Sequence, residues 1–313
     1  MKTKYPYSKE LKKPATYGEV DYEKIMLDGS MEKVSVFLSK MAASFKCKHA
    51  DMEKIDIVSS DGTSFPCYVF TPKTAPQAQG YPAMVYYHGG GFMFPVQRFM
   101  MKNSELFASQ AGVKVFLPDF RISLHVDCET IMADCMAALH YVFDNADSLQ
   151  INTSRVLLYG DSAGGALAST VVIWNRDKDT YPLCGQLLAY PVCDKESWKY
   201  ASIETYRDAV WTKSGNEAMW RVYLGRGCHN LSRFIPMAND LHGLPPTYIE
   251  AAEMDTLHDE ALAYAEKLQE SGVEVELRTV PGAYHGYDGD LKSPVTQKSF
   301  EHRYAAIRRF INA

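Results

Sequence analysis

The chain has 313 residues, of which 46% are hydrophobic and 12% aromatic, and its formal net charge is −5 at pH 7. This length suits one α/β sheet with added segments, and the apolar content supplies a large core. A weakly acidic chain with a pI of about 6.0 lacks the basic surface of a nucleic-acid-binding protein, so no nucleic-acid partner is expected. No apolar run approaches the roughly 20 residues that cross a bilayer, so no stable membrane insertion is expected.

The first 50 residues carry helical rather than strand patterns. Apolar spacing at 22–26 and 34–38 predicts amphipathic helices outside the sheet, and residues 1–50 are interpreted as an N-terminal cap segment. The first residues are charged and lack the apolar stretch of a secretory signal, which predicts a cytoplasmic protein. Two strand patterns, at 54–58 and 64–70, then flank Asp61-Gly62 and predict a hairpin.

A glycine-rich loop follows the next buried-strand pattern, at 81–87. It reads His88-Gly89-Gly90-Gly91-Phe92. Consecutive glycines let backbone N–H groups point into a site without obstruction by side chains. An acyl-transfer enzyme needs such donors for the tetrahedral oxyanion. A helix around 104–110, a strand at 114–118 and a helix at 130–143 are predicted to follow.

The most informative segment is Gly160-Asp161-Ser162-Ala163-Gly164-Gly165. It joins the apolar strand pattern 155–159 to a helix that begins at about residue 163. A serine on such a sharp turn sits on strained backbone and needs small neighbours. The nearby helix N-terminus favours negative charge. The segment is therefore predicted to be a nucleophile elbow, with Ser162 as the nucleophile.

The base and the acid that orients it are expected later in the chain, in the order Ser, Asp, His. A predicted strand at 246–252 leads to Asp255, and a helix is predicted at about 258–270. The strand at 273–280 leads to His285 in a loop. Both side chains lie just beyond the carboxyl ends of predicted parallel strands, where open α/β sheets place their sites.

Neighbouring residues are weaker candidates for these roles. Asp259 and Glu260 fall on the helix after Asp255 and are interpreted as cap and surface charges. The histidines His258 and His302 also lie on predicted helices, whereas His285 lies in a loop between glycine and aromatic residues. Asp255 and His285 are therefore the predicted partners of Ser162.

Residues 196–241 interrupt the alternation of strands and helices after the predicted strand 185–191. An insertion at the carboxyl edge of the sheet would lie over the serine and gate access to it. The predicted organisation is thus a core of residues 51–195 and 242–313 with a cap insertion at 196–241. The insertion is rich in aromatic residues: Trp198, Tyr200, Tyr206, Trp211, Trp220 and Tyr223.

The cysteines form no recognisable framework. An odd number of scattered cysteines without a C-x-x-C pattern predicts reduced, mostly buried thiols in a cytoplasmic protein. Neither a metal site nor a cofactor is predicted. The seven are Cys47, Cys67, Cys128, Cys135, Cys184, Cys193 and Cys228.

From about Tyr68 to its end, the chain resembles the hormone-sensitive-lipase-like α/β-hydrolases, also called bacterial family IV esterases. The resemblance implies a mostly parallel eight-stranded sheet flanked by helices, with a helical cap. It also implies that the N–H groups of Gly89, Gly90 and Ala163 form the oxyanion hole, supported by His88, Gly91 and Asp161. The matching segments are the glycine loop 88–92, the elbow 160–165, Gly243-Leu244-Pro245-Pro246, the segment 255–260 and His285-Gly286.

One stretch departs from the family pattern. After Arg121 the family has a proline-containing segment, whereas residues 124–129 here contain no proline. The register is kept, because Asp134 falls where the family has an acidic residue on the following helix. The departure leaves open which side chains support the active-site loops.

The resemblance implies a serine carboxylesterase that acts on small-molecule esters of short to medium acyl chains. An amidase or peptidase of the same fold uses the same triad and remains an alternative. A non-catalytic, ligand-binding protein of this fold is a second alternative, although such proteins often lose a triad residue. Family members often pair through their last strand, here about residues 274–280, which is compatible with a homodimer.

Overall fold

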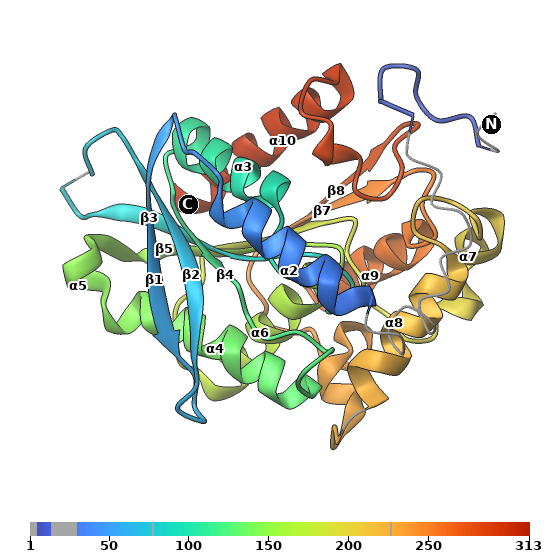
Figure 1. Ribbon diagram of the computed structural model, residues 1–313, viewed down its shortest axis with the longest axis horizontal. Helices are drawn as coiled ribbons and strands as arrows, with labels where there is room; N and C mark the ends of the chain where they lie inside the picture. The colour runs from blue at the N-terminus through green and yellow to red at the C-terminus, as the bar shows by residue number, and fades with distance from the viewer. Residues whose placement is uncertain (1–4, 14–29, 77, 226) are drawn as a thin grey trace.

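An eight-stranded sheet crosses the computed structural model, which describes residues 5–13, 30–76, 78–225 and 227–313 (Figure 1). Its strand order is β1-β2-β4-β3-β5-β6-β7-β8. Only β2 runs antiparallel to its neighbours, and all other pairs are parallel, which confirms the predicted fold class. The strands are β1 (Ala50–Val58), β2 (Ser64–Pro72), β3 (Tyr81–Tyr87), β4 (Lys114–Pro118), β5 (Ile151–Asp161), β6 (Gly185–Ala189), β7 (Thr247–Ala252) and β8 (Val275–Val280).

Helices cover both faces of this sheet, with α3 and α10 on one side and α4, α6 and α9 on the other. A strand buried on both faces presents alternate side chains to two cores. In β3, Val85 faces the core that includes α4 and α6, whereas Met84 and Tyr86 face the core beneath α10. The helices are α2 (Ser30–Ala43), α3 (Arg98–Leu106), α4 (Cys128–Asp144), α5 (Ala146–Leu149), α6 (Ala163–Lys178), α7 (Ala201–Thr205), α8 (Lys213–Gly225), α9 (His258–Glu270) and α10 (Pro294–Ile311).

Most predicted elements are present. The β1–β2 hairpin closes around Asp61-Gly62 with Val58 opposite Ser64. The helix expected at 104–110 begins earlier, at Arg98, and ends in a π-helical turn at Phe107–Ala111, where Gly112 adopts a left-handed φ of 73°. The predicted helix at 34–38 is part of α2, and the one at 22–26 lies outside the described residues.

Residues 196–241 leave the sheet after β6 and return to it before β7. They contain α7 and α8, drawn in yellow and light orange in Figure 1, together with short 3₁₀ turns. No strand interrupts this segment among its described residues. Trp211 and Met219 from this segment lie close to Gly91, so the insertion contacts the glycine loop.

A disulfide joins Cys128, the first residue of α4, to Cys228 beyond the end of α8. The two residues are 100 positions apart in sequence, with a Cα–Cα distance of 5.9 Å. The prediction of seven reduced thiols is therefore wrong for this pair, because only the folded chain brings them together. The other five cysteines are free.

None of the helices in the described part of the chain combines the length and the apolar character needed to cross a bilayer.

Candidate active site

Ser162 lies at the tip of the turn between β5 and α6. Its φ of 55° and ψ of −125° place it in a region that non-glycine residues rarely adopt. A Cβ on Gly160 would lie 2.1 Å from the carbonyl oxygen of Gly164, and one on Gly164 would lie 2.0 Å from that of Tyr87. Because these neighbours are backbone atoms, the turn can pack against β3 only with glycine at both positions.

The structure brings the three predicted side chains together. The Oγ of Ser162 lies 2.7 Å from Nε2 of His285, and Nδ1 of His285 lies 2.6 Å from Oδ2 of Asp255. Asp255 is buried, and its Oδ1 accepts a hydrogen bond from the Leu257 N–H at 3.2 Å and lies 3.3 Å from the Thr256 hydroxyl oxygen. An imidazole that donates from Nδ1 to the carboxylate has Nε2 free to accept the serine proton.

The competing candidates lie elsewhere. His258 contacts the carbonyl oxygen of Ala252 through Nδ1 and is not the histidine that contacts Ser162. Asp259 caps α7, where it accepts a hydrogen bond from the Ser202 N–H. The expectation that Glu260 is a surface charge is wrong. It is fully buried, and one of its carboxylate oxygens accepts from the Cys193 N–H at 2.9 Å.

One predicted oxyanion donor is engaged within the protein. The N–H of Gly89, which was predicted to serve the oxyanion hole, donates in this structure to Oδ1 of Asp161 at 3.2 Å. The reason is local, because Asp161 is buried directly beside the loop and requires a donor. Gly90 and Gly91 follow with positive φ values of 109° and 62°. In the described parts of the chain, the N–H groups of Gly90, Gly91 and Ala163 have no side-chain or loop acceptor.

His88 supports the loop rather than reacting. Its ring is buried and stacks on Phe120 with the ring centroids 4.2 Å apart, and its Nδ1 donates to the Gly89 carbonyl oxygen at 2.8 Å. Burial lowers the pKa of His88 to about 4. The ring is therefore neutral at neutral pH and fixes the first peptide of the loop.

The residues just before the segment that departs from the family pattern also brace this loop. The Arg121 guanidinium binds both carboxylate oxygens of Asp134, at 2.9 and 2.6 Å. The adjacent chain bonds to the glycine loop, because the Ser123 N–H donates to the Phe92 carbonyl oxygen at 2.8 Å. The support that the sequence left open thus comes from an ion pair and from a backbone hydrogen bond to the loop, without prolines.

A buried charged cluster lies beneath the site and was not predicted from the sequence. Arg303 of α10 is fully buried, and its guanidinium lies 2.5 Å from Glu250 of β7 and 2.7 Å from Asp288. Asp288 follows His285 by three residues. An arginine in an amphipathic terminal helix looks like a surface residue in the sequence. The signal that could have found it is its place on the apolar face of α10, in line with Phe300, Ile307 and Phe310.

Asp161, next to the nucleophile, is expected to make stability depend on pH. Burial, and then the charge of Asp288, raise its pKa to about 7. The folded state therefore keeps a proton that the unfolded chain releases above about pH 4, and stability falls as the pH rises from about 4 to 7. Asp161→Asn lacks this titration but keeps an oxygen for the Gly89 N–H.

Urea unfolding of wild type and Asp161→Asn at pH 5 and pH 8 measures the effect. Between these two values, wild type is expected to lose about 3 kcal/mol of unfolding free energy relative to the variant. Parallel pH dependence in the two proteins would show that Asp161 does not hold this proton.

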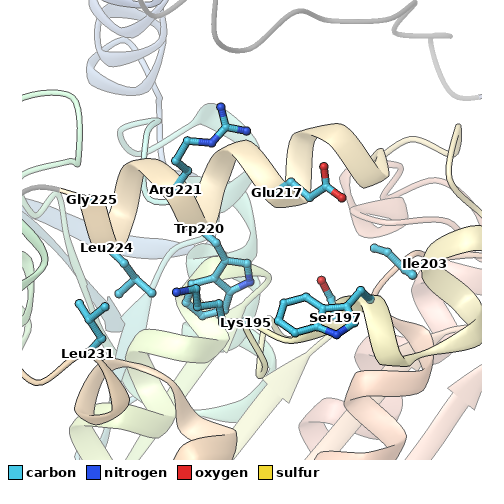
Figure 2. Close-up of a pocket in the computed structure, with 10 residues that line it drawn as sticks. Lys195, Ser197, Ile203, Glu217, Trp220, Arg221, Leu224, Gly225 and Leu231 are labelled. Carbon is cyan, nitrogen blue, oxygen red and sulfur yellow. The ribbon is translucent and has the colours of Figure 1, made fainter.

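An open hollow of about 390 Å³ lies within the insertion, between α8 and the chain at residues 195–203 (Figure 2). Figure 2 shows Trp220 near its centre, with Leu224 and Leu231 at one end. None of the triad residues lines it. The hollow is lined by residues of the insertion and by Lys195 just before it.

Together, the mostly parallel sheet and the serine elbow, carboxylate and histidine at its carboxyl edge define an α/β-hydrolase. The family model for the alpha/beta hydrolase fold matches residues 84–288. The chain belongs to this family as a hormone-sensitive-lipase-like esterase, which places it among the carboxylic ester hydrolases.

Individual relatives agree with this placement. Lipase 2 of Moraxella sp. (strain TA144) is 31% identical over 294 residues, which cover 82% of this chain and 67% of the relative. Carboxylesterase NlhH of Mycobacterium tuberculosis is 31% identical over 263 residues and 82% of each chain. Among solved structures, a bacterial heroin esterase has a TM-score of 0.82 at 28% identity over 92% of both chains. The carboxylesterase EstE1 has a TM-score of 0.81 at 29% identity, covering 91% of this chain and 97% of its own.

Proposed function

We propose that the protein is a serine carboxylesterase that hydrolyses short- to medium-chain acyl esters through Ser162, His285 and Asp255. The observation that carries the proposal is the continuous hydrogen-bonded path from the Ser162 hydroxyl through the imidazole to the Asp255 carboxylate, with distances of 2.7 and 2.6 Å. These are the lengths expected for a nucleophile, a general base and its orienting acid.

In this mechanism, His285 Nε2 takes the proton of Ser162 as its Oγ attacks the ester carbonyl carbon. Asp255 holds the imidazole in the reactive tautomer and stabilises the imidazolium that forms. The tetrahedral intermediate collapses, and the alcohol leaves with the proton from His285. Water, deprotonated by the same imidazole, then attacks the acyl-enzyme and releases the carboxylic acid.

The developing oxyanion is assigned to the N–H groups of Gly90 and Ala163, with Gly91 as a third donor. Ala163 is the first residue of α6, where N–H groups lack intrahelical partners and the helix dipole favours negative charge. Each such donor is worth about 3 kcal/mol of barrier. The Gly89 N–H is left out because it is bonded to Asp161.

Segments 1–50 and 196–241 are proposed to form the cap over this site. Three contacts support the assignment. The ring centroids of Trp211 and His285 lie 5.8 Å apart, and the carbonyl oxygen of Trp211 accepts from the hydroxyl of Thr256, next to Asp255. Residues 5–13 run along the histidine loop, where the Ser8 N–H donates to the Gly282 carbonyl oxygen at 2.9 Å.

The cytoplasmic location and the homodimer stay predictions from the sequence.

A series of p-nitrophenyl esters from acetate to palmitate tests the proposal, with matched p-nitroanilides to detect amidase activity. Strong turnover of the short esters, with rates that fall for long chains and are much lower for the anilides, is expected. Faster cleavage of anilides would favour the amidase alternative, because amide cleavage requires protonation of a poorer leaving group. A folded protein without turnover of either series would point to the binding alternative.

A further inference from the structure

Tyr190, immediately after β6, has an unusual backbone for a large side chain. It is buried, with 2% of its surface exposed, and its φ is 37°. Its N–H donates to the carbonyl oxygen of Glu250 at 2.6 Å, which ties the end of β6 to β7. Positive φ at a non-glycine residue persists only where surrounding contacts enforce it, and such residues concentrate at functional sites.

The side chain of Tyr190 contacts the histidine loop in two ways. Its ring meets the His285 ring edge-on, with the centroids 5.1 Å apart and the planes at 69°. Its hydroxyl donates to Oδ1 of Asp288 at 2.5 Å, and Oδ2 of the same carboxylate is held by Arg303. Burial raises the pKa of Tyr190 well above its ordinary value, so the hydroxyl remains a donor.

These two contacts act on two different residues of the histidine loop. One acts on the imidazole itself, and the other acts on a residue three positions further along the same loop. The Tyr287 hydroxyl, between them in sequence, donates to Glu250 at 2.5 Å, so the loop after His285 is anchored twice in the Arg303 cluster. Two aromatic rings are described in contact with the His285 ring, those of Tyr190 and Trp211. Of these two side chains, Tyr190 is the one described as also bonding to an anchor of the loop, Asp288.

We propose that Tyr190 is a positioning residue for ester hydrolysis: its ring restricts the tilt of the His285 imidazole and its hydroxyl fixes the His285 loop through Asp288. The proposal rests on the proposed function of His285 as the base. Rate falls steeply when a reacting group is displaced from its productive geometry, whereas binding of a small ester changes little. A positioning role therefore predicts a loss in kcat with little change in KM.

Tyr248 provides the matched control. Its hydroxyl donates to Glu250 of the same Arg303 cluster at 3.0 Å, and it is equally buried, but its ring has no described contact with His285. Tyr190→Phe and Tyr248→Phe each remove one buried hydroxyl from the cluster. A merely structural role predicts similar effects of the two substitutions.

The experiment compares kcat and KM for p-nitrophenyl acetate, urea unfolding, and the low-field proton resonance of the His285–Asp255 hydrogen bond. Tyr190→Phe is expected to lower kcat about tenfold, to leave KM nearly unchanged and to shift or broaden the resonance. Tyr190→Leu, which also lacks the ring, is expected to lower kcat further, and the phenylalanine variant keeps the test decisive if the leucine variant fails to fold. Tyr248→Phe is expected to leave kcat and the resonance near those of wild type.

Equal losses of kcat in the two phenylalanine variants, in proportion to their losses of stability, would overturn the proposal. So would a Tyr190→Phe variant with the kcat and resonance of wild type. If wild type hydrolyses no ester, the proposed function fails separately. The resonance of the His285–Asp255 hydrogen bond then still decides whether Tyr190 positions the imidazole.

Discussion

Ser162→Ala is expected to lower kcat for p-nitrophenyl acetate by a factor on the order of 10⁶, because the variant lacks the atom that attacks the carbonyl carbon. The unfolding free energy is expected to stay near that of wild type. Alanine keeps the Cβ that serine already places on the strained turn, where φ is 55°. The measurement is steady-state kinetics together with covalent labelling by a fluorophosphonate, which modifies activated serines.

Ser169→Ala is the matched control for this prediction. Ser169 lies on the same helix, α6, and is buried, but its hydroxyl pairs with that of Tyr264 away from the triad. This variant is expected to keep the wild-type rate and the labelling. Labelling of Ser162→Ala with turnover close to that of wild type would assign the nucleophile to another residue.

Arg303→Met is expected to lower the free energy of unfolding by about 3–5 kcal/mol, because it leaves Glu250 and Asp288 buried without their cation. All three side chains are fully buried, so water cannot replace the guanidinium. This loss is a large part of the about 5–15 kcal/mol that stabilises a typical domain. Urea unfolding monitored by tryptophan fluorescence measures it.

Arg309→Met on the same helix is the control. Arg309 pairs with Glu276 at 2.6 Å, but both side chains are partly exposed, and surface ion pairs contribute about 0–1 kcal/mol. Adding Glu250→Gln and Asp288→Asn to Arg303→Met removes the unpaired charges and is expected to restore part of the stability. Equal small losses for the two arginine variants would show that the buried cluster is not stabilised by its charges.

The sequence was most informative where function and fold depend on local chemistry. The elbow could be predicted because a strained serine turn requires glycine at residues 160 and 164, and no other residue fits the 2.0–2.1 Å approaches of neighbouring backbone. Helix α9, which spans His258–Glu270, and strand β7 followed from hydrophobic patterns in short windows. The grouping of Ser162, Asp255 and His285 at one site could be predicted because each follows a strand that ends at the same edge of the sheet.

Several features of the site depend instead on contacts between distant parts of the chain. The direction of the Gly89 N–H is decided by Asp161, 72 residues away, whose buried carboxylate needs a donor. The Cys128–Cys228 disulfide likewise appears only once the insertion has packed against the core, and the buried contact of Glu260 only once α9 lies beside the chain after β6.

The sequence by itself thus determined the strands, the elbow and the candidate triad, because glycine sterics and hydrophobic periodicity act over a few residues. Tertiary structure alone decided how the triad loops are held. Arg303 looks like one more charge on a terminal helix until α10 packs beneath the sheet, where it meets Glu250 and Asp288. A buried charge is stable only beside its partners, and those partners lie 53 and 15 residues away in sequence.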